Sequence, residues 1–155
     1  MKVLILSDSH GNTYNVRAAL AKHPDAGHII FLGDGERDFE YLGADIGTRP
    51  LTMVCGNCDF GSQLNDKELV RISGNLVYCV HGHKQFVKYG LDSLMKEAEE
   101  TGASLALFGH THEQYTDYID GLHIMNPGSI NEYEYGIADI TEQGIVLSKM
   151  TLYKY

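Results

Sequence analysis

The chain alternates short apolar runs with short polar segments along its whole length. Residues 2–7 (KVLILS) form an apolar run with β-branched side chains, which predicts a buried strand. Residues 28–32 (HIIFL) and the segment 50–57 (PLTMVCGN) predict two more buried strands. Residues 104–112 (SLALFGHTH) repeat the same order of apolar run, glycine and polar residues, so we expect a further strand there.

Turn signals indicate hairpins in the remaining apolar segments. Three of them are expected: residues 68–83 around Gly74-Asn75, residues 115–129 around Asp120-Gly121, and a terminal pair of strands around residues 141–144 (TEQG).

Helical periodicity is confined to two segments. Asn12 is expected to cap a helix that runs to about Lys22. Apolar residues recur at helical spacing within residues 89–101, and Gly102 is the expected C-terminal stop. Because the predicted strands outnumber the helices, we expect an α/β fold in which two sheets pack together with helices on the outside.

Five of the predicted strands run directly into a small polar cluster. The clusters are Asp8-Ser9-His10, Gly33-Asp34, Gly56-Asn57-Cys58-Asp59, His81-Gly82-His83 and Gly109-His110-Thr111-His112. In layered α/β proteins the ligand crevice lies beyond the carboxyl ends of the strands. Five such clusters in one short chain therefore predict a single shared site.

The collected side chains have the chemistry of a metal centre. Two carboxylates, an amide and four or five imidazoles suit Zn²⁺, Mn²⁺ or iron, whereas an all-oxygen set would favour Mg²⁺ or Ca²⁺. They are too many for one tetrahedral cation and enough for two cations that share a carboxylate. Two divalent cations outweigh the charges of Asp8 and Asp34, and with a bridging hydroxide the site keeps about one positive charge, which attracts a phosphate.

Length and charge narrow the classes of partner. The 155 residues predict a single domain, residues 1–155. The formal net charge of −9, without a Lys/Arg-rich stretch, disfavours long nucleic acid and anionic membranes. The apolar run at the start of the sequence is too short for a signal peptide or a membrane span. The sequence contains 3 cysteines, an odd number. We therefore expect a cytoplasmic protein with free thiols and no membrane association.

Five motifs carry a family resemblance. In chain order, DSH, GD, GNCD, HGH and GHTH resemble the signature motifs of the calcineurin-like metallophosphoesterase superfamily. The short length and the late NPGS segment (residues 126–129) are similar to its small, single-domain YfcE-type phosphodiesterases of bacteria and archaea. The resemblance spans residues 3 to 130. It implies a four-layer α-β-β-α sandwich with the site at the strand ends.

The resemblance also implies which residues hold two divalent cations. The first cation would be held by Asp8, His10 and His112, the second by Asn57, His81 and His110, and Asp34 would bridge both. Mn²⁺ is the usual activating metal in such enzymes, with Ni²⁺, Fe²⁺ and Zn²⁺ as alternatives. The expected reaction is in-line attack on phosphorus by a metal-bridging hydroxide, without a covalent enzyme intermediate.

Residues beside the implied ligands are candidates for catalysis and substrate binding. The catalytic candidates are Asn57, Cys58, Asp59 and His83, and the substrate-binding candidates are Asn12, Asn57 and His81. Cys58 occupies the place where the superfamily often has a histidine, a candidate general acid, so the source of the leaving-group proton stays open. Asp59 is expected to orient a metal ligand without binding the metal itself. Asn12 either approaches the phosphate or only caps the first helix.

Cys58 has a second interpretation. Together with Cys55 it forms a Cys-x-x-Cys pair, which resembles a dithiol redox motif. Such motifs usually open a helix, and residues 59–66 (DFGSQLND) show no clear helical period. The sequence therefore favours the metal site over the redox function.

The expected function is hydrolysis of a small phosphodiester. The chain shows no cap domain and no arginine cluster that would clamp a dianionic phosphate, which favours diesters over monoesters. A phosphomonoesterase on the same site is one alternative. Another is a non-catalytic scaffold similar to the small subunit of retromer, although all seven ligand positions match the enzymes. A homo-oligomer is compatible with an exposed edge strand.

Overall fold

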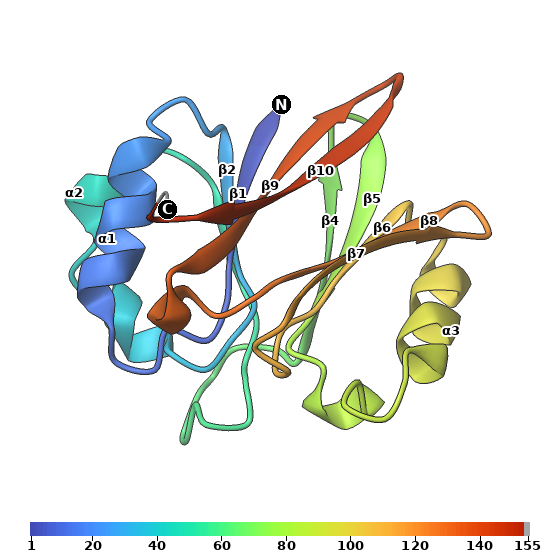
Figure 1. Ribbon diagram of the computed structural model, residues 1–155, viewed down its shortest axis with the longest axis horizontal. Coiled ribbons are helices and arrows are strands. Elements are labelled where there is room, and N and C mark those ends of the chain that lie inside the picture. The colour runs from blue at the N-terminus through green and yellow to red at the C-terminus, as the bar shows by residue number, and fades with distance from the viewer. Residues whose placement is uncertain (154–155) are drawn as a thin grey trace.

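The computed structural model describes residues 1–153 and contains two five-stranded sheets that pack face to face (Figure 1). The first sheet has the order β10 (Gly144–Thr151), β9 (Glu134–Thr141), β1 (Lys2–Leu6), β2 (His28–Phe31) and β3 (Leu51–Met53). The second sheet has the order β4 (Lys67–Ile72), β5 (Asn75–Val80), β6 (Leu105–Leu107), β8 (Leu122–Pro127) and β7 (Gln114–Ile119).

Helices cover the outer faces of both sheets. The α-helices are α1 (Thr13–Lys22), α2 (Gly43–Ile46) and α3 (Asp92–Thr101), and three short 3₁₀ turns are η1 (Glu36–Phe39), η2 (His83–Gln85) and η3 (Ile130–Glu132). Figure 1 shows α1 and α2 on the side of the first sheet and α3 on the side of the second. The layers are therefore α-β-β-α, as the sequence motifs imply. No helix within residues 1–153 has the length and apolar character needed to span a bilayer.

Burial on both faces explains the continuous apolar runs. In β1, Val3 and Ile5 join the core between the two sheets, whereas Leu4 and Leu6 join the core under α1. Successive side chains of a strand point to opposite faces, so a strand covered on both sides must be apolar at every position. The second sheet repeats the arrangement, because β6 places Leu105 and Leu107 between the sheets and Ala106 under α3.

The parallel strands bring the polar clusters to one edge. β1, β2 and β3 run parallel in the first sheet, and β5, β6 and β8 run parallel in the second. The five polar clusters follow the carboxyl ends of β1, β2, β3, β5 and β6. This confirms that the clusters stand at strand ends on both sheets.

Most local expectations are confirmed, and one turn is displaced. Asn12 caps α1, since its side chain accepts a hydrogen bond from the Asn15 backbone N–H, and Gly102 ends α3 in a left-handed conformation. The first hairpin turns at Ser73-Gly74 rather than at Gly74-Asn75, because Asn75 pairs with Ile72. Ser73 and Gly74 have φ of 47° and 80°, the positive values that the twist of a two-residue hairpin favours.

Candidate metal centre

Six of the seven side chains expected to bind cations lie together at the edge where the two sheets meet. They form two groups, Asp8, His10 and His112 in one and Asp34, His81 and His110 in the other. Within each group, the ligand atoms all lie within 4.8 Å of one another. Hydrogen bonds join the sheets at this point. His81 Nδ1 lies 2.7 Å from the Leu32 carbonyl oxygen, and the His110 backbone N–H donates to Asp8 Oδ2 at 3.1 Å.

The backbone of these residues is strained. Nine non-glycine residues within 1–153 have positive φ, and five of the nine are expected ligands: Asp8 (55°), His10 (42°), Asp34 (63°), His110 (71°) and His112 (61°). Residues in this region cost of order 1–3 kcal/mol each and persist only where the surrounding structure holds them. The strain therefore supports a functional site at this edge.

Two glycines let the backbone pass close to the carboxylates. A Cβ atom at Gly109 would lie 2.1 Å from Ser7 Oγ and 2.8 Å from Asp8 Oδ2. A Cβ atom at Gly56 would lie 2.2 Å from Asp34 Oδ1. Any side chain at either position would displace a carboxylate, which accounts for the glycines in the third and fifth motifs.

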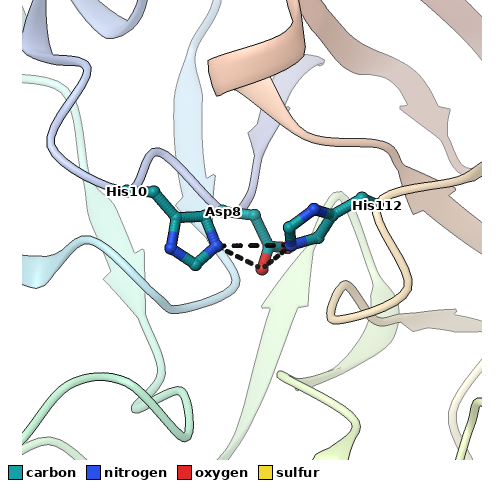
Figure 2. Close-up of side chains that lie close together, drawn as sticks. All are labelled: Asp8, His10 and His112. Atoms are coloured by element: carbon teal, nitrogen blue, oxygen red, sulfur yellow. Dashed lines mark hydrogen bonds and ion pairs between the residues drawn. The ribbon is translucent and has the colours of Figure 1, made fainter.

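Asp8 presents one bound and one free carboxylate oxygen. Ser7 Oγ donates to its Oδ2 at 2.5 Å, as does the His110 backbone N–H. Oδ1 is buried and accepts no hydrogen bond from the described residues. It lies 3.4 Å from His10 Nε2 and 3.2 Å from His112 Nε2, and Figure 2 shows both rings turned toward it. A buried carboxylate oxygen needs a positive partner, and a cation among these three groups would supply it.

Asp34 is held from two sides. The Cys58 backbone N–H donates to its Oδ1 at 2.7 Å, and its Oδ2 lies 3.1 Å from His81 Nε2 and 3.9 Å from His10 Nε2. Burial opposes ionisation of Asp34, but the hydrogen bond and the charge of His81, together with the hydrogen bond from Cys58, outweigh it and lower the pKa of Asp34 to about 2. Asp34 is therefore an ionised carboxylate at neutral pH, the state that a metal ligand requires.

The histidines of the second group have distinct protonation tendencies. Burial disfavours the charged form of His81, but the hydrogen bond with Asp34 and the negative charges of Asp8 and Asp34 together outweigh it and raise the pKa of His81. Burial, and next the charge of His81, lower the pKa of His110 to about 4. Because His81 Nδ1 must donate to the Leu32 carbonyl, its Nε2 is the ring nitrogen available to a cation. Nitrogen and oxygen donors with one unpaired buried oxygen fit a pair of divalent cations.

Asp59 organises the loop that carries Asp34. Its Oδ2 accepts hydrogen bonds from the backbone N–H groups of Asp34 and Gly56 at 2.8 and 2.9 Å. Its Oδ1 accepts from Gly35 and Glu36 at 2.9 and 3.0 Å. One carboxylate thus joins the loops that follow β2 and β3, which gives a structural basis for the positioning role expected of it.

The other expected site residues occupy the rim or the surroundings of the two groups. Asn57 is exposed and its Nδ2 donates to Cys58 Sγ at 3.5 Å, so its place among the ligands stays a prediction. Asn12 caps α1 and donates from Nδ2 to Asn131 Oδ1 at 3.1 Å. The ring of His83 has its centroid 5.5 Å from that of His81, and its buried Nδ1 has no hydrogen-bond partner among the described residues.

The cysteines do not form a redox motif. Cys55 and Cys58 are free thiols, and turns rather than a helix follow them. Burial, and then nearby carboxylates, raise the pKa of the Cys58 thiol, and burial likewise raises that of Cys55. A redox-active pair needs a lowered thiol pKa, so the structure does not support this alternative.

Residues outside the motifs also support the site. Asp38 Oδ2 accepts from Ser9 Oγ at 2.6 Å and from the Gly11 N–H at 2.9 Å, which fixes the loop that carries His10. Ser129 of the NPGS segment donates from Oγ to the Asp8 carbonyl oxygen at 2.8 Å. Asp38 lies in a charged segment with no pattern that distinguishes it, so nothing in the sequence pointed to its role.

A cleft of about 380 Å³ opens beside the two groups. Its walls come from the loops that follow β1, β2 and β3, and its lining residues are His10, Gly11, Asp34, Gly35, Glu36, Arg37, Asp38, Cys58, Asp59 and Phe60. Four of these carry carboxylates and one a guanidinium. The Phe60 ring is 83% exposed, so it stands at the rim with a free apolar face.

Sequence comparison assigns the chain to a family. The model of the calcineurin-like phosphoesterase superfamily domain matches residues 1–143. The chain belongs to this superfamily. It is 33% identical over 131 residues to the probable metallophosphoesterase YsnB of Bacillus subtilis. The matched region covers 84% of this chain and 75% of YsnB. It is 27% identical over 162 residues to the phosphodiesterase MJ0936 of Methanocaldococcus jannaschii, covering 90% of each protein.

Solved structures agree with the superfamily fold. A conserved protein of Streptococcus pneumoniae, described as a predicted phosphoesterase, superposes with a TM-score of 0.84 at 21% identity, over 97% of this chain and 89% of that one. Vps29 of Entamoeba histolytica complexed with Zn²⁺ superposes with a TM-score of 0.74 at 18% identity, over 99% of this chain and 100% of that one. At these identities the likeness concerns the fold.

Proposed function

We propose that the protein is a phosphodiesterase that acts through two divalent cations. Asp8, His10 and His112 hold the first cation, His81, His110 and Asn57 hold the second, and Asp34 bridges them. The observation that carries the proposal is the buried Asp8 Oδ1, which lies among imidazole nitrogens and accepts no hydrogen bond from the described residues. Membership of the superfamily and the name of the archaeal relative support the activity.

The chain's own residues supply the framework of the reaction. When bound, two cations supply the positive charge that attracts a phosphate and an activated water for in-line attack. Asp34 stays ionised at neutral pH, and Asp59 fixes the loop on which it stands. Ser7 holds one oxygen of Asp8 and leaves the other directed at the imidazoles. His83 lies beside His81, and its proposed role is to contact a phosphate oxygen or a neighbouring ligand.

The charges of the cleft favour diesters over monoesters. Asp34, Glu36, Asp38 and Asp59 line it with a single guanidinium, that of Arg37. A monoester brings about two negative charges at neutral pH, as in phosphoserine, and a diester brings one, so the acidic walls repel a monoester more strongly. Phe60 at the rim offers an apolar face to an aromatic or nucleoside substituent. We propose a small phosphodiester as the substrate and Mn²⁺ as the activating metal.

The test compares two chromogenic substrates. Metal-free protein supplied with Mn²⁺ is expected to hydrolyse bis-p-nitrophenyl phosphate with a kcat/KM at least about tenfold above that for p-nitrophenyl phosphate. Asp34→Asn is expected to abolish both activities. Asp25→Asn is the matched control, because Asp25 is exposed and forms a surface ion pair with Lys2.

Three outcomes would contradict parts of the proposal. A preference for the monoester would assign a phosphomonoesterase to the same site. Cation binding without turnover of either ester would favour a scaffold, as the fold shared with Vps29 allows. Full activity in Asp34→Asn would remove the bridging role of Asp34.

A further inference from the structure

The thiol of Cys58 lies with two of the proposed metal ligands. The ligand atoms of His10, Asp34 and Cys58 all fall within 4.8 Å of one another. The Cys58 backbone N–H donates to Asp34 Oδ1 at 2.7 Å, which holds the Cys58 backbone beside the carboxylate. Asp59 joins the loops that bear the two residues, which makes this proximity a fixed feature of the fold.

We propose that Cys58 binds the cation held by His10 and Asp34 as a thiolate ligand, and that it gives this position a preference for soft divalent ions such as Zn²⁺, Co²⁺ and Cd²⁺ over Mn²⁺. On binding, a sulfur–metal bond forms and the thiol proton passes to solvent. Thiolate ligands select softer metals, whereas carboxylates and water suit Mn²⁺. The inference deepens the proposed function and rests on it, because His10 and Asp34 belong to both.

A second observation adds a carboxylate donor beside His10. Asp8 is fully buried, and its Oδ1 lies 3.4 Å from His10 Nε2 without a hydrogen bond from the described residues. The sulfur of Cys58 and carboxylate oxygens of Asp8 and Asp34, from three loops, therefore all lie near the imidazole of His10. Thiolate, imidazole and carboxylate donors are the ligand types that zinc sites use.

The surroundings of the three cysteines single out Cys58. Cys58 is exposed beside the cleft, where an ion reaches it from solvent. Cys79 is buried in the core between the sheets, and the Cys55 thiol contacts the carbonyl oxygens of Gly56 and Asp59. A thiolate bound to a cation has no proton to donate, so Cys58 does not serve as a general acid while a soft ion occupies this position.

Optical titration with Co²⁺ tests the inference without using activity. The metal-free full-length chain, kept reduced, is titrated with Co²⁺ while the thiolate-to-cobalt charge-transfer band is followed in the near ultraviolet. We expect the band in the unaltered protein and in Cys55→Ser, and its loss in Cys58→Ser. Since Cys58 is exposed, Cys58→Ser is expected to keep the unaltered circular dichroism spectrum.

The affinities of the same variants for Cd²⁺ and Mn²⁺ give a second test of the thiolate ligand. Cys58→Ser is expected to weaken Cd²⁺ binding at least about tenfold, the lower end of the losses typical of residues around a bound metal. Its Mn²⁺ affinity is expected to stay within about threefold, since Mn²⁺ gains little from sulfur. Equal losses for the two ions would overturn the proposed preference.

The outcomes separate this inference from the proposed function. Mn²⁺ binding with no charge-transfer band in the unaltered protein, or a band that persists in Cys58→Ser, would overturn the thiolate ligand alone. Failure of every cation to bind would overturn both proposals.

Discussion

Replacing Asp59 with asparagine tests how the loop that carries Asp34 is held. The carboxylate accepts four backbone N–H groups, two on each oxygen, at 2.8–3.0 Å. An asparagine keeps one acceptor oxygen, and either orientation of its amide turns the NH₂ group toward two N–H donors. Asp59→Asn therefore removes two hydrogen bonds to a charged acceptor.

The expected cost is large for a domain of this size. A hydrogen bond to a charged group contributes about 1.5–3 kcal/mol, so two predict a loss of about 3–6 kcal/mol. Asp59 is half-buried and water reaches part of the freed N–H groups, which reduces the expected loss to about 2–4 kcal/mol. Proteins are stable by only about 5–15 kcal/mol, so the effect is measurable as a shift of the unfolding transition.

Urea unfolding of the metal-free protein measures the change in free energy directly. The control is Asp25→Asn, the same substitution at an exposed ion pair, for which a change within about 0.5 kcal/mol is expected. An Asp59→Asn variant as stable as this control would refute the positioning role. A variant that is destabilised and yet binds cations with unaltered affinity would show that Asp59 supports the fold but not the site.

Two further predictions concern the site and its cleft. Ser7→Ala removes the hydrogen bond to Asp8 Oδ2 and is expected to weaken Mn²⁺ binding, measured by calorimetry, about 10–100-fold. The control Ser148→Ala, on β10, is expected to keep the Mn²⁺ affinity of the unaltered protein. Equal Mn²⁺ affinities in the two variants would contradict the prediction. Phe60→Ala is expected to raise KM for an aryl phosphodiester about threefold or more with kcat nearly constant, whereas Tyr89→Ala, an exposed aromatic outside the cleft, has no effect. An unchanged KM in Phe60→Ala would remove the ring from the substrate site.

The strands and the polar clusters were predictable because each depends on a short, continuous stretch of the sequence. Residues 3–6 of β1 are all apolar since each face of the strand packs on a core, and the polar residues begin where the strand ends. The turn of the first hairpin was not predictable, because Ser73-Gly74 and Gly74-Asn75 are both turn dipeptides. The pairing of Ile72 with Asn75 decides between them.

The contacts of the supporting residues could not be predicted from sequence patterns, although the NPGS segment that contains Ser129 is part of the family resemblance. α2 (Gly43–Ile46) and the 3₁₀ turns are too short to show a period. Asp38 and Ser129 act through hydrogen bonds between segments far apart in the chain, such as that from Ser129 Oγ to the Asp8 carbonyl oxygen. Motif order located the ligands, whereas the contacts that orient them depend on the tertiary structure.

The number of cations bound per chain tests the central claim most directly. Metal-free protein equilibrated with Mn²⁺, freed of excess ion and analysed by elemental analysis is expected to hold two cations per chain. Asp34→Asn, which loses the ionised oxygen that lies 3.1 Å from His81 Nε2 and 3.9 Å from His10 Nε2, is expected to hold fewer than two and to bind them more weakly. One cation or none in the unaltered protein, or two in Asp34→Asn with unaltered affinity, would contradict the account.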